Sequence, residues 1–470
     1  MSENDSYIFG TPSPTIGTTT AAVEEPRTQP AREPEPKPAN DNGADGAIQY
    51  RSHGDKSIWG IFIALCFISI IELYSASSRE VAAAGVYGPI LRHCIMLGTG
   101  AAIVWGLERV HYKYFFGFAW IIAAISVLSM VYVLFFGEIV NGARRSMSLM
   151  GFTIQPSEFI KMSAVLIIAK IMSQSQKPKG MGVKTRGIIT CAIVVLVFGG
   201  VLFTQGLTNT ILLMSISISM MLIGGIEWKK LGIVLGVYAV IAAGMLFFKD
   251  SRESVSEDVP VATTAVMAKD DDLAENKAER HATWQARLQR FMSDKPKYEE
   301  AITATNRQEM YSYMAQANGG FFGVFPGNSR ETARLPLAFS DYIYAIIIED
   351  TGFFGGFMLL LIYLGLLARA GVIARKCHRA FPVLLVMGMA VMIVFQALFH
   401  MAITTGTFPV SGQPLPLISK GGTSILVTSI AFGAMLSVSR TAVQNGTKKE
   451  DKEELSSLPE ELRANNPVQI

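Results

Sequence analysis

The chain has 470 residues, of which 50% are hydrophobic and only 17% are charged, and its mean hydropathy is +0.34. A soluble chain of this length would carry about a quarter charged residues, so the composition indicates an integral membrane protein. The net charge of +3 is too small to suggest a nucleic-acid partner, and no basic cluster is interleaved with aromatic residues.

The N-terminal segment, residues 1–55, is rich in Pro, Glu, Thr, Asn and Asp and contains few aromatic residues. Such a segment buries too little apolar surface to offset the entropy lost on ordering, so we predict a disordered tail. No basic stretch is followed by an apolar one there, which predicts that no signal peptide is cleaved. Residues 441–470 form a second, charged tail.

Ten apolar stretches between the tails are each about 17 to 25 residues long, which is enough to cross a bilayer. They fall at 57–77, 90–107, 114–136, 158–174, 187–205, 208–226, 231–248, 340–368, 381–404 and 422–440. The predicted fold is therefore an all-α integral membrane protein with ten transmembrane helices. Helices 1–7 occupy residues 56–248, a large extracytoplasmic loop occupies 249–338, and helices 8–10 occupy 339–440.

The short loops set the predicted orientation, because cytoplasmic loops carry an excess of Lys and Arg. With the N-terminus inside, the inner short loops hold twelve such residues and the outer ones five. The five are Arg79, Arg92, Arg144, Arg145 and Lys420. We therefore expect both termini in the cytoplasm of a multi-pass protein of the bacterial inner membrane.

Three segments on the predicted outer face stand out: 407–424 is rich in glycine and proline, 319–329 is rich in glycine, and 334–352 carries the acids Asp341, Glu349 and Asp350. Irregular backbone at membrane depth persists only where it is buried in protein or lines a polar cavity. Acids within a membrane span are costly, so Glu349 and Asp350 are read either as functional groups or as a pairing between helices. Asp341 lies near the outer boundary, where a role as an interfacial cap is the alternative.

These segments carry a family resemblance. The stretches "YSAS" (74–77), "GARR" (142–145), "QPSEFIK" (155–161), "GVFPGNS" (323–329), "LPLAFSDYIYAIIIEDTG" (335–352) and "PVSGQPLPLISKGGTS" (409–424) occur in this order. Together they resemble the SEDS family (shape, elongation, division, sporulation), whose members include FtsW, RodA and SpoVE. The resemblance implies a ten-helix peptidoglycan glycosyltransferase that polymerises lipid II outside the cytoplasmic membrane and releases undecaprenyl pyrophosphate.

The resemblance also implies partners and a place for the arginines. The expected partners are lipid II, the growing lipid-linked glycan chain, a class B penicillin-binding protein and other divisome membrane proteins. Arg144 and Arg145 are read as a clamp for the substrate pyrophosphate, because the arginine fork donates two parallel hydrogen bonds to phosphate. The alternative is an interfacial pair that reaches lipid phosphates. Lys161 either supports this clamp or pairs with Glu158 across one helical turn.

Glycosyl transfer needs a base that takes the proton from the acceptor hydroxyl. In the family this is an aspartate of the large loop, between an Arg/Phe element and a Gln that opens a helix. Arg287, Arg290 and Phe291 match the first element and Gln308 matches the second, but the interval between them is longer than the family pattern. Asp294 is therefore the first candidate base, with Glu299 and Glu300 as alternatives.

The resemblance implies further candidates for substrate binding. They are Glu158, Lys161, Arg287, Gln308, Asp341, Ser419, Gly421, Gly422 and Ser424. His400 stands where the family usually has asparagine, and no second His or Cys lies at ligand spacing, so no metal site is predicted. No cofactor is assigned, although a carboxylate beside a pyrophosphate would suit Mg²⁺ or Mn²⁺.

Other functions stay open at this point. The long N-terminal segment and the wording "GQPLPLIS" favour an FtsW-like division enzyme over a RodA-like elongation enzyme. A lipid II flippase is a second class, although no repeated halves, which transporters often show, are visible. A non-catalytic scaffold of the division complex is a third, which the two tails would serve.

Overall fold

The computed structural model describes residues 53–76, 87–140, 143–149, 152–177, 182–238, 291, 302–303, 306–332, 334–335 and 338–442. All of them belong to one compact unit, Gln49–Ile470. Nearly all of the predicted tails and most of the predicted loop 249–338 lie outside these ranges. The domain boundaries and the disorder expected there therefore stay predictions.

Within the described residues, helices stand at nine of the ten predicted spans. They are α1 (Lys56–Ala76), α3 (Tyr87–Arg109), α4 (Lys113–Phe136), α5 (Pro156–Gln174), α6 (Thr185–Phe203), α7 (Leu207–Ile223), α11 (Ile343–Ala374), α12 (Ala380–Thr404) and α13 (Gly422–Thr441). Residues 228–238 of the remaining span are helical too, and its end lies outside the described residues. The count of ten therefore stays a prediction.

Seven of the described helices are long and apolar enough to cross a membrane. α7 is a shorter apolar helix, and α5 differs from the seven because it carries Glu158, Lys161 and Lys170. A helix satisfies its own backbone hydrogen bonds, which is why apolar runs of this length fold as helices in lipid. The prediction of an all-α membrane protein is thus confirmed for the spans.

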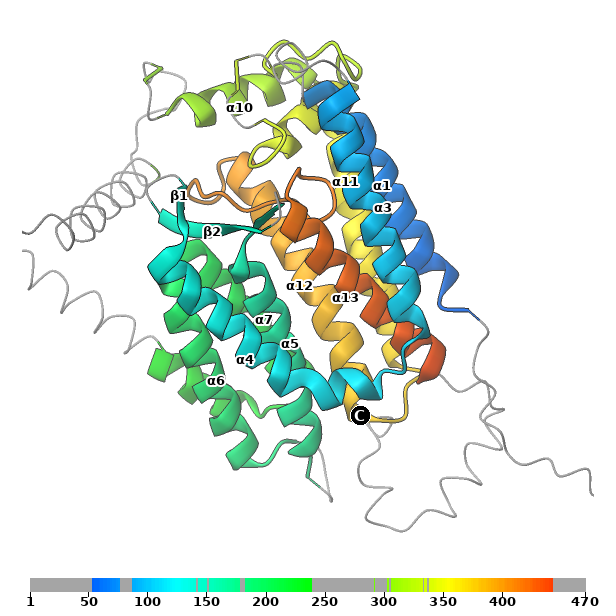
Figure 1. Ribbon diagram of the computed structural model, residues 1–470, viewed down its shortest axis with the longest axis vertical. Coiled ribbons are helices and arrows are strands. Elements are labelled where there is room, and N and C mark those ends of the chain that lie inside the picture. The colour runs from blue at the N-terminus through cyan, green and yellow to red at the C-terminus, as the bar shows by residue number, and fades with distance from the viewer. Residues whose placement is uncertain are drawn as a thin grey trace, which may run out of the picture. The chain divides into compact units, whose positions relative to one another are not determined.

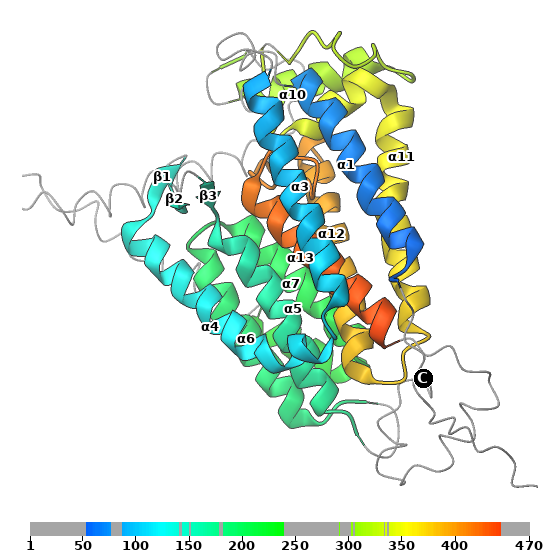
Figure 2. The same cartoon turned by 45° about the vertical axis from the view of Figure 1, so that its right-hand side comes forward.

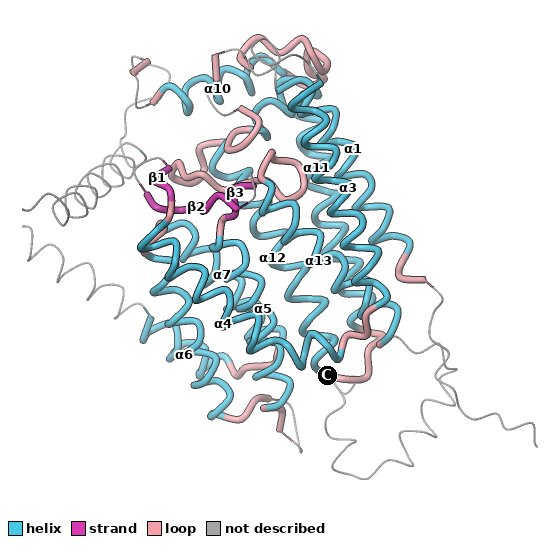
Figure 3. Tube along the Cα trace, in the orientation of Figure 1, coloured by secondary structure: helices cyan, strands magenta, loops and turns pink. Residues whose placement is uncertain are grey.

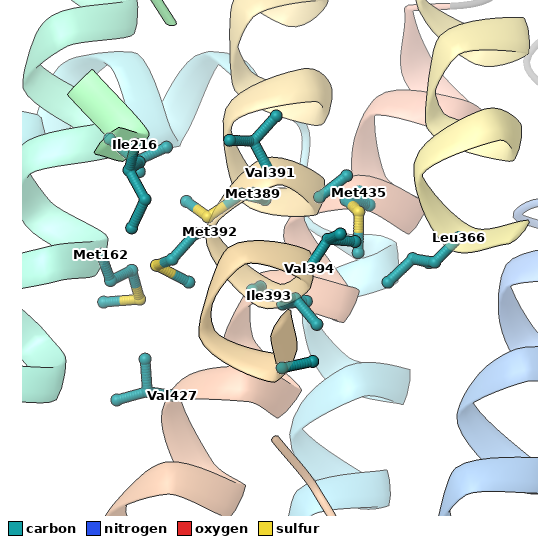
Figure 4. Packing of buried hydrophobic residues seen from close by; sticks show 14 of the residues in the cluster. Met162, Ile216, Leu366, Met389, Val391, Met392, Ile393, Val394, Val427 and Met435 are labelled. Atoms are coloured by element: carbon teal, nitrogen blue, oxygen red, sulfur yellow. The ribbon is translucent and has the colours of Figure 1, made fainter. Parts of the chain in front are cut away.

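α12 and α13 form the inside of the bundle, with 78% and 83% of their apolar windows buried, against no more than 39% in the other candidate spans. Figure 4 shows the side chains of α12 in the middle of this core, with Met162, Ile216 and Val427 from neighbouring helices around them. Gly388 lets α12 approach its neighbours closely, because a Cβ there would lie 2.7 Å from Val165 Cγ1.

A small antiparallel sheet stands between α4 and α5, where the sequence analysis expected only a loop. Its strands are β1 (Glu138–Val140), β2 (Ala143–Leu149) and β3 (Phe152–Ile154), in the order β1-β2-β3. Polar and apolar residues alternate over 146–149, which is the period of a strand. The sheet contacts α4, α5 and α13 at one end of the bundle (Figures 1 and 3).

α11 is interrupted at Gly352 (φ 72°, ψ −179°), and the segment before it in the chain fills the break. Four backbone hydrogen bonds join them: Val324 N to Glu349 O, Phe325 N to Asp350 O, Phe353 N to Gly320 O and Phe354 N to Phe321 O, at 2.8–3.2 Å. Gly323 has a positive φ of 80°, and a Cβ there would overlap the Asp350 carbonyl. The glycines are therefore required by close backbone contact.

The helix α10 (Arg307–Gly319) lies at the same end and packs on α11 and α12 (Figures 1 and 2). We call this the sheet end: it comprises β1–β3, α10 and the segments 319–335 and 405–421. The proposed orientation places it outside the membrane.

Candidate functional site

A polar stripe on the buried face of α12 organises the site. Gln396, His400 and Thr404 follow one another at four-residue spacing, which places them on one face of the helix. All three are buried, between 0% and 4% exposed. The side chains of Gln396 and His400 and the backbone carbonyl of Thr404 each hold a different part of the chain, so this face of α12 connects α5, the 405–421 segment and α10.

The first contact is a buried ion pair in α5. Lys161 Nζ lies 2.7 Å from Glu158 Oε1, and the two side chains are 0% and 3% exposed. Gln396 completes the group: its Nε2 donates to Glu158 Oε2 at 3.1 Å and its Oε1 accepts from Lys161 at 3.4 Å. A buried pair is tolerated only when its remaining hydrogen-bonding capacity is satisfied, and Gln396 does so. Of the two alternatives for Lys161, the structure shows the pairing with Glu158.

The second contact fixes the glycine- and proline-rich segment. His400 Nδ1 lies 2.6 Å from the Gln413 carbonyl oxygen. Because that oxygen only accepts, Nδ1 carries the proton, and Nε2 of the neutral ring is an acceptor. Gln396 Nε2 lies 3.4 Å from the next carbonyl, that of Pro414. Tyr363 OH donates to the Pro416 carbonyl at 2.7 Å. Side chains of two helices thus hold three carbonyls of the segment.

A side-chain contact extends the network to α7. Gln413 Nε2 donates to Asn209 Oδ1 at 2.9 Å, and both residues are buried. Residues 415–419 of the segment are buried as well. The irregular backbone of this segment is therefore buried in protein, which is one of the two ways in which such backbone persists at membrane depth.

The third contact joins α12 to α10. The Thr404 carbonyl accepts from Ser312 Oγ at 3.0 Å and from Gln316 Nε2 at 2.7 Å. Gln308 lies in the first turn of α10, as the family pattern implied for a Gln that opens a helix. The backbone carbonyl of Thr404 therefore positions α10, the one helix of the predicted large loop among the described residues.

Two of the predicted substrate-binding residues serve the packing of the segment. Ser419 is fully buried; its Oγ donates to the Ser340 carbonyl at 2.7 Å and accepts from Leu415 N at 2.8 Å. Asp341 is half-buried and accepts from Ser340 Oγ at 3.1 Å. Its Oδ2 would lie 3.0 Å from a Cβ on Gly412. The stretches before α11 and α13 therefore run side by side.

The two glycines at the start of α13 have room for a small side chain, although they belong to a motif that resembles the family. Gly421 has an extended backbone (φ −125°), and a Cβ there would meet only ordinary contacts at 3.5 and 3.9 Å. At Gly422 a Cβ would lie 2.8 Å from Met96 Cε, the flexible end of a side chain. Ser424 Oγ, in the first turn of α13, is buried.

The arginine pair lies in the central strand of the sheet. Arg144 and Arg145 belong to β2, and Arg144 pairs in register with Ile139 of β1. After β3, Gln155 N donates to Thr423 Oγ1 at 3.0 Å, which ties the sheet to the start of α13. The "GARR" and "KGGTS" motifs, nearly 300 positions apart in the chain, are thereby brought to one end of the bundle.

Glu349 holds the segment beside the break in α11. Its carboxylate accepts from the backbone N of Arg330 at 3.0 Å, from Glu331 N at 3.4 Å and from the Ser329 hydroxyl. Asn318 Nδ2 lies 3.4 Å away. Because Asn318 belongs to α10, the acid of α11 pairs with another helix as well as with the loop, so the structure shows the pairing between helices that the sequence offered as one alternative.

Several buried polar atoms at the sheet end have no hydrogen-bond partner among the described residues. They are His400 Nε2, Gln413 Oε1, Ser411 Oγ, Ser157 Oγ and Ser424 Oγ. Buried polar groups in native proteins are nearly always paired, so a cluster of such atoms marks a place for water or a polar ligand. Ser411, Gln413 and Ser424 belong to the motif 409–424, and His400 contacts it.

Some predicted residues are not placed, and some placed residues were not predicted. Asp294, Glu299, Glu300 and Arg287 lie outside the described residues. Gln396, Gln413 and Asn209 were missed; the only sequence signal was a polar residue in an apolar helix or beside a proline. Within the described ranges, no group of three or more His, Cys, Asp or Glu side chains is arranged to hold a metal ion.

These observations define a multi-pass α-helical membrane protein with a polar site at one end of its bundle. The chain belongs to the FtsW/RodA/SpoVE family, described as "Cell cycle protein", which it matches over residues 55–444. The resemblance drawn from the motifs is confirmed.

Individual relatives agree with this assignment. The chain is 26% identical over 404 residues to the "Probable peptidoglycan glycosyltransferase FtsW" of Bacillus subtilis (strain 168), covering 84% of this chain and 93% of that protein. It is 23% identical over 391 residues to the "Peptidoglycan glycosyltransferase MrdB" of Escherichia coli (strain K12), covering 82% and 93%.

Solved structures show the same fold. The chain superposes on the rod shape determining protein RodA of Thermus thermophilus with a TM-score of 0.56 at 21% identity, covering 85% of this chain and 100% of that chain. A chain from the structure titled "Structural coordination of polymerization and crosslinking by a peptidoglycan synthase complex" gives 0.60 at 20% identity, covering 83% and 99%.

Proposed function

We propose that this protein is a peptidoglycan glycosyltransferase that polymerises lipid II at the outer face of the bacterial cytoplasmic membrane during cell division. Its relatives carry the names of peptidoglycan glycosyltransferases over more than four fifths of the chain. One structural observation supports a shared site: "QPSEFIK" and "PVSGQPLPLISKGGTS" are joined by Gln155 to Thr423 and by Gln396 to Glu158 and Pro414. The arginines of "GARR" lie in β2, which pairs with β3 directly before Gln155.

The proposed reaction joins two lipid-linked glycans. A carboxylate of the large loop takes the proton of the acceptor hydroxyl, whose oxygen forms a bond to the anomeric carbon of the donor. The bond from that carbon to the pyrophosphate breaks, and undecaprenyl pyrophosphate departs with the electron pair. Arginines stabilise the charge that develops on the leaving group, an interaction that is worth most in a water-poor site.

A polymerisation assay tests this proposal. Purified protein in detergent, given lipid II, should form glycan strands, because detergent leaves no membrane across which a flippase could act. A sharper version adds the proposed partner, a class B penicillin-binding protein. A protein that binds this partner but never polymerises lipid II under either condition is a scaffold, and the enzyme proposal would be wrong.

The arginine clamp makes a separate prediction. Arg144→Ala and Arg145→Ala should each weaken substrate binding and turnover, and Lys at either position should rescue only in part, because the bidentate fork is lost. Arg375→Ala with Lys376→Ala is a matched control, since both residues are exposed at the opposite end of the bundle. Full activity in the Arg144→Ala, Arg145→Ala double variant would exclude the clamp.

The catalytic base is proposed to be Asp294, with Glu299 and Glu300 as alternatives. Asp294→Asn keeps the shape of the side chain and removes its basicity, so polymerisation should be lost while substrate binding and folding are kept. If Asp294→Asn is active and Glu299→Gln or Glu300→Gln is inactive, the base is that glutamate. If all three variants are active, the base lies elsewhere.

The proposed orientation places both termini in the cytoplasm and the large loop outside. In a cysteine-free background, Asn328→Cys should react with an impermeant reagent added to intact spheroplasts, and Lys184→Cys should react only after permeabilisation. Both side chains are exposed, so access to the reagent depends on the side of the membrane. The reverse pattern of labelling would invert the topology.

A further inference from the structure

The segment 320–334 is a rigid platform at the end of α11. Its backbone is joined to the break in α11 on one side, and the Glu349 carboxylate accepts from the backbone N–H groups of Arg330 and Glu331 on the other. Gly327 N donates to Ser75 Oγ of α1 at 3.1 Å. The side chains that this segment exposes are therefore held at fixed positions beside α1 and α11.

Six exposed phenylalanines surround this platform. Phe321, Phe322 and Phe325 belong to the segment, and Phe353, Phe354 and Phe357 to α11; they are between 42% and 73% exposed. Several of these rings touch: Phe321 lies 4.8 Å from Phe322 and 6.3 Å from Phe354, between centroids. Phe353 lies 6.4 Å from Phe357, between centroids, and Phe325 follows Phe322 in the same segment. We call these six exposed rings the phenylalanine patch.

Phe325 shows that the patch is more than an ordinary lipid-facing surface. Its φ is +71°, and among the described residues only Leu417 is another non-glycine residue with a positive φ. That conformation strains a residue with a bulky side chain, and strain of this kind persists where it serves a function. In this case the strained residue presents a ring that is 70% exposed.

Two arginines follow Phe325 in the same segment. Arg330 is exposed, and Arg334 follows it in a turn closed by Arg334 N to Glu331 O at 2.9 Å. The Arg334 side chain is 63% exposed although its Nη1 lies 3.4 Å from Glu331 Oε1. The platform therefore presents guanidinium groups next to a wide apolar surface.

We propose that the platform binds an anionic phospholipid. The lipid phosphate would lie between Arg330 and Arg334, and its acyl chains would lie along the phenylalanine patch. Guanidinium groups form charge-assisted, bidentate hydrogen bonds with phosphate, and the exposed rings match the acyl region below the head group. This amphipathic combination complements a phospholipid better than it does a protein surface or a free anion.

The platform is distinct from the proposed pyrophosphate clamp. The sheet that carries Arg144 and Arg145 contacts α4, α5 and α13, whereas the platform contacts α1 and α11 (Figures 1 and 2). Both α1 and α11 have only a third of their apolar windows buried, so they offer a surface to lipid. The lipid site therefore does not rest on the proposed glycosyltransferase activity.

Binding is measured on the full-length protein without substrate. Wild-type protein is delipidated in detergent and titrated with phosphatidylglycerol or phosphatidylcholine, and bound lipids are counted by native mass spectrometry. We expect tighter binding of phosphatidylglycerol, weakened about tenfold in Arg330→Gln, Arg334→Gln because the charge-assisted hydrogen bonds are lost. Lys184→Gln, Arg186→Gln removes two exposed charges at the opposite end and should bind like the wild type.

Phe325→Gly separates binding from folding. Glycine removes the ring and also relieves the positive φ, so the thermal midpoint should not fall while phosphatidylglycerol binding weakens. Equal affinity of the wild type for both lipids would overturn the proposal, as would an equal loss in the Lys184, Arg186 control. It would also be overturned if only undecaprenyl pyrophosphate bound, or if the arginine variants lost a transmembrane protein partner but kept phosphatidylglycerol.

Discussion

Ion pairs are buried to different extents at the two ends of the helix bundle. At the sheet end, the ion pair between Lys161 and Glu158 is fully enclosed, with side chains 0% and 3% exposed. At the opposite end, Lys177 and Glu227 form an ion pair of similar length, 3.0 Å, but their side chains are 36% and 48% exposed. Water solvates the second pair in both the folded and the unfolded protein, whereas in the folded protein the first pair depends entirely on its protein partners.

Buried polar atoms without a hydrogen-bond partner are also distributed unequally between the two ends. Most of the buried polar atoms without a hydrogen-bond partner among the described residues lie at the sheet end, including those of His400 and Gln413. At the opposite end, charged groups such as Arg369 and Asp55 pair with one another. A fold carries such polar groups in its interior at a cost in stability, so we propose that the substrate binds at the end where they concentrate.

The largest expected effect comes from breaking the enclosed pair. Glu158→Leu leaves the Lys161 ammonium buried without its carboxylate and should lower the free energy of unfolding by about 3–5 kcal/mol. Adding Lys161→Met should recover a large part of this loss, because the unpaired charge is then removed. Thermal unfolding in detergent, followed by fluorescence, measures both changes.

The exposed pair supplies the control for that experiment. Glu227→Gln should change the thermal midpoint little, since Lys177 and Lys230 stay in contact with water. If Glu158→Leu were as mild as Glu227→Gln, the enclosed pair would be hydrated in the protein, and the contrast between the two ends would disappear.

The helices could be predicted from the sequence because each apolar run is long enough to span the bilayer and lipid permits little else. α5 was found for the same reason despite Glu158 and Lys161, and their spacing already offered the pairing that the structure shows. The sheet was not predicted, because strands of three and seven residues between two spans leave only a faint alternation, at 146–149.

The site was predictable only where the motifs are local. The family resemblance identified the arginine motif and the glycine-rich segment as parts of the site. Nothing in the sequence indicated that Gln396 contacts both Glu158 and Pro414. That contact joins residues 238 positions apart, and such distances depend on how α5 and α12 pack. The base could not be located because the interval containing Asp294 departs in length from the family pattern.

A second, smaller effect distinguishes two glycines at the sheet end. Gly323→Ala forces a Cβ into the Asp350 carbonyl at a φ of 80° and should lower the free energy of unfolding by more than about 1 kcal/mol. Gly421→Ala meets only ordinary contacts and should leave the thermal midpoint unchanged. If substrate approaches the backbone at Gly421, polymerisation should nevertheless fall, more so with Gly421→Val; normal turnover in both variants would place the substrate elsewhere.

The smallest effect concerns Asp55 and Arg369 at the opposite end, where charge is only partly enclosed. Asp55 accepts from Arg369 Nε at 2.9 Å and Nη2 at 2.6 Å, and its Oδ1 also caps α1 through Ser57 N at 3.0 Å. Burial by itself would raise the pKa of Asp55, but the hydrogen bonds and the charge of Arg369 outweigh it, so the pKa lies below its ordinary value of 3.8.

The direction of this shift fixes the pH dependence. An acid whose pKa is lower in the folded protein contributes stability that is complete above the unfolded value and is lost as the pH falls through the folded value. Asp55→Asn should therefore lower the thermal midpoint at pH 7, and the difference from the wild type should shrink as the pH falls below 3.8. Arg369→Lys, which keeps the charge but loses the fork, should lie between the two at pH 7. A difference that stayed constant with pH would mean that Asp55 stabilises α1 as an uncharged cap, and that its contact with Arg369 does not depend on ion pairing.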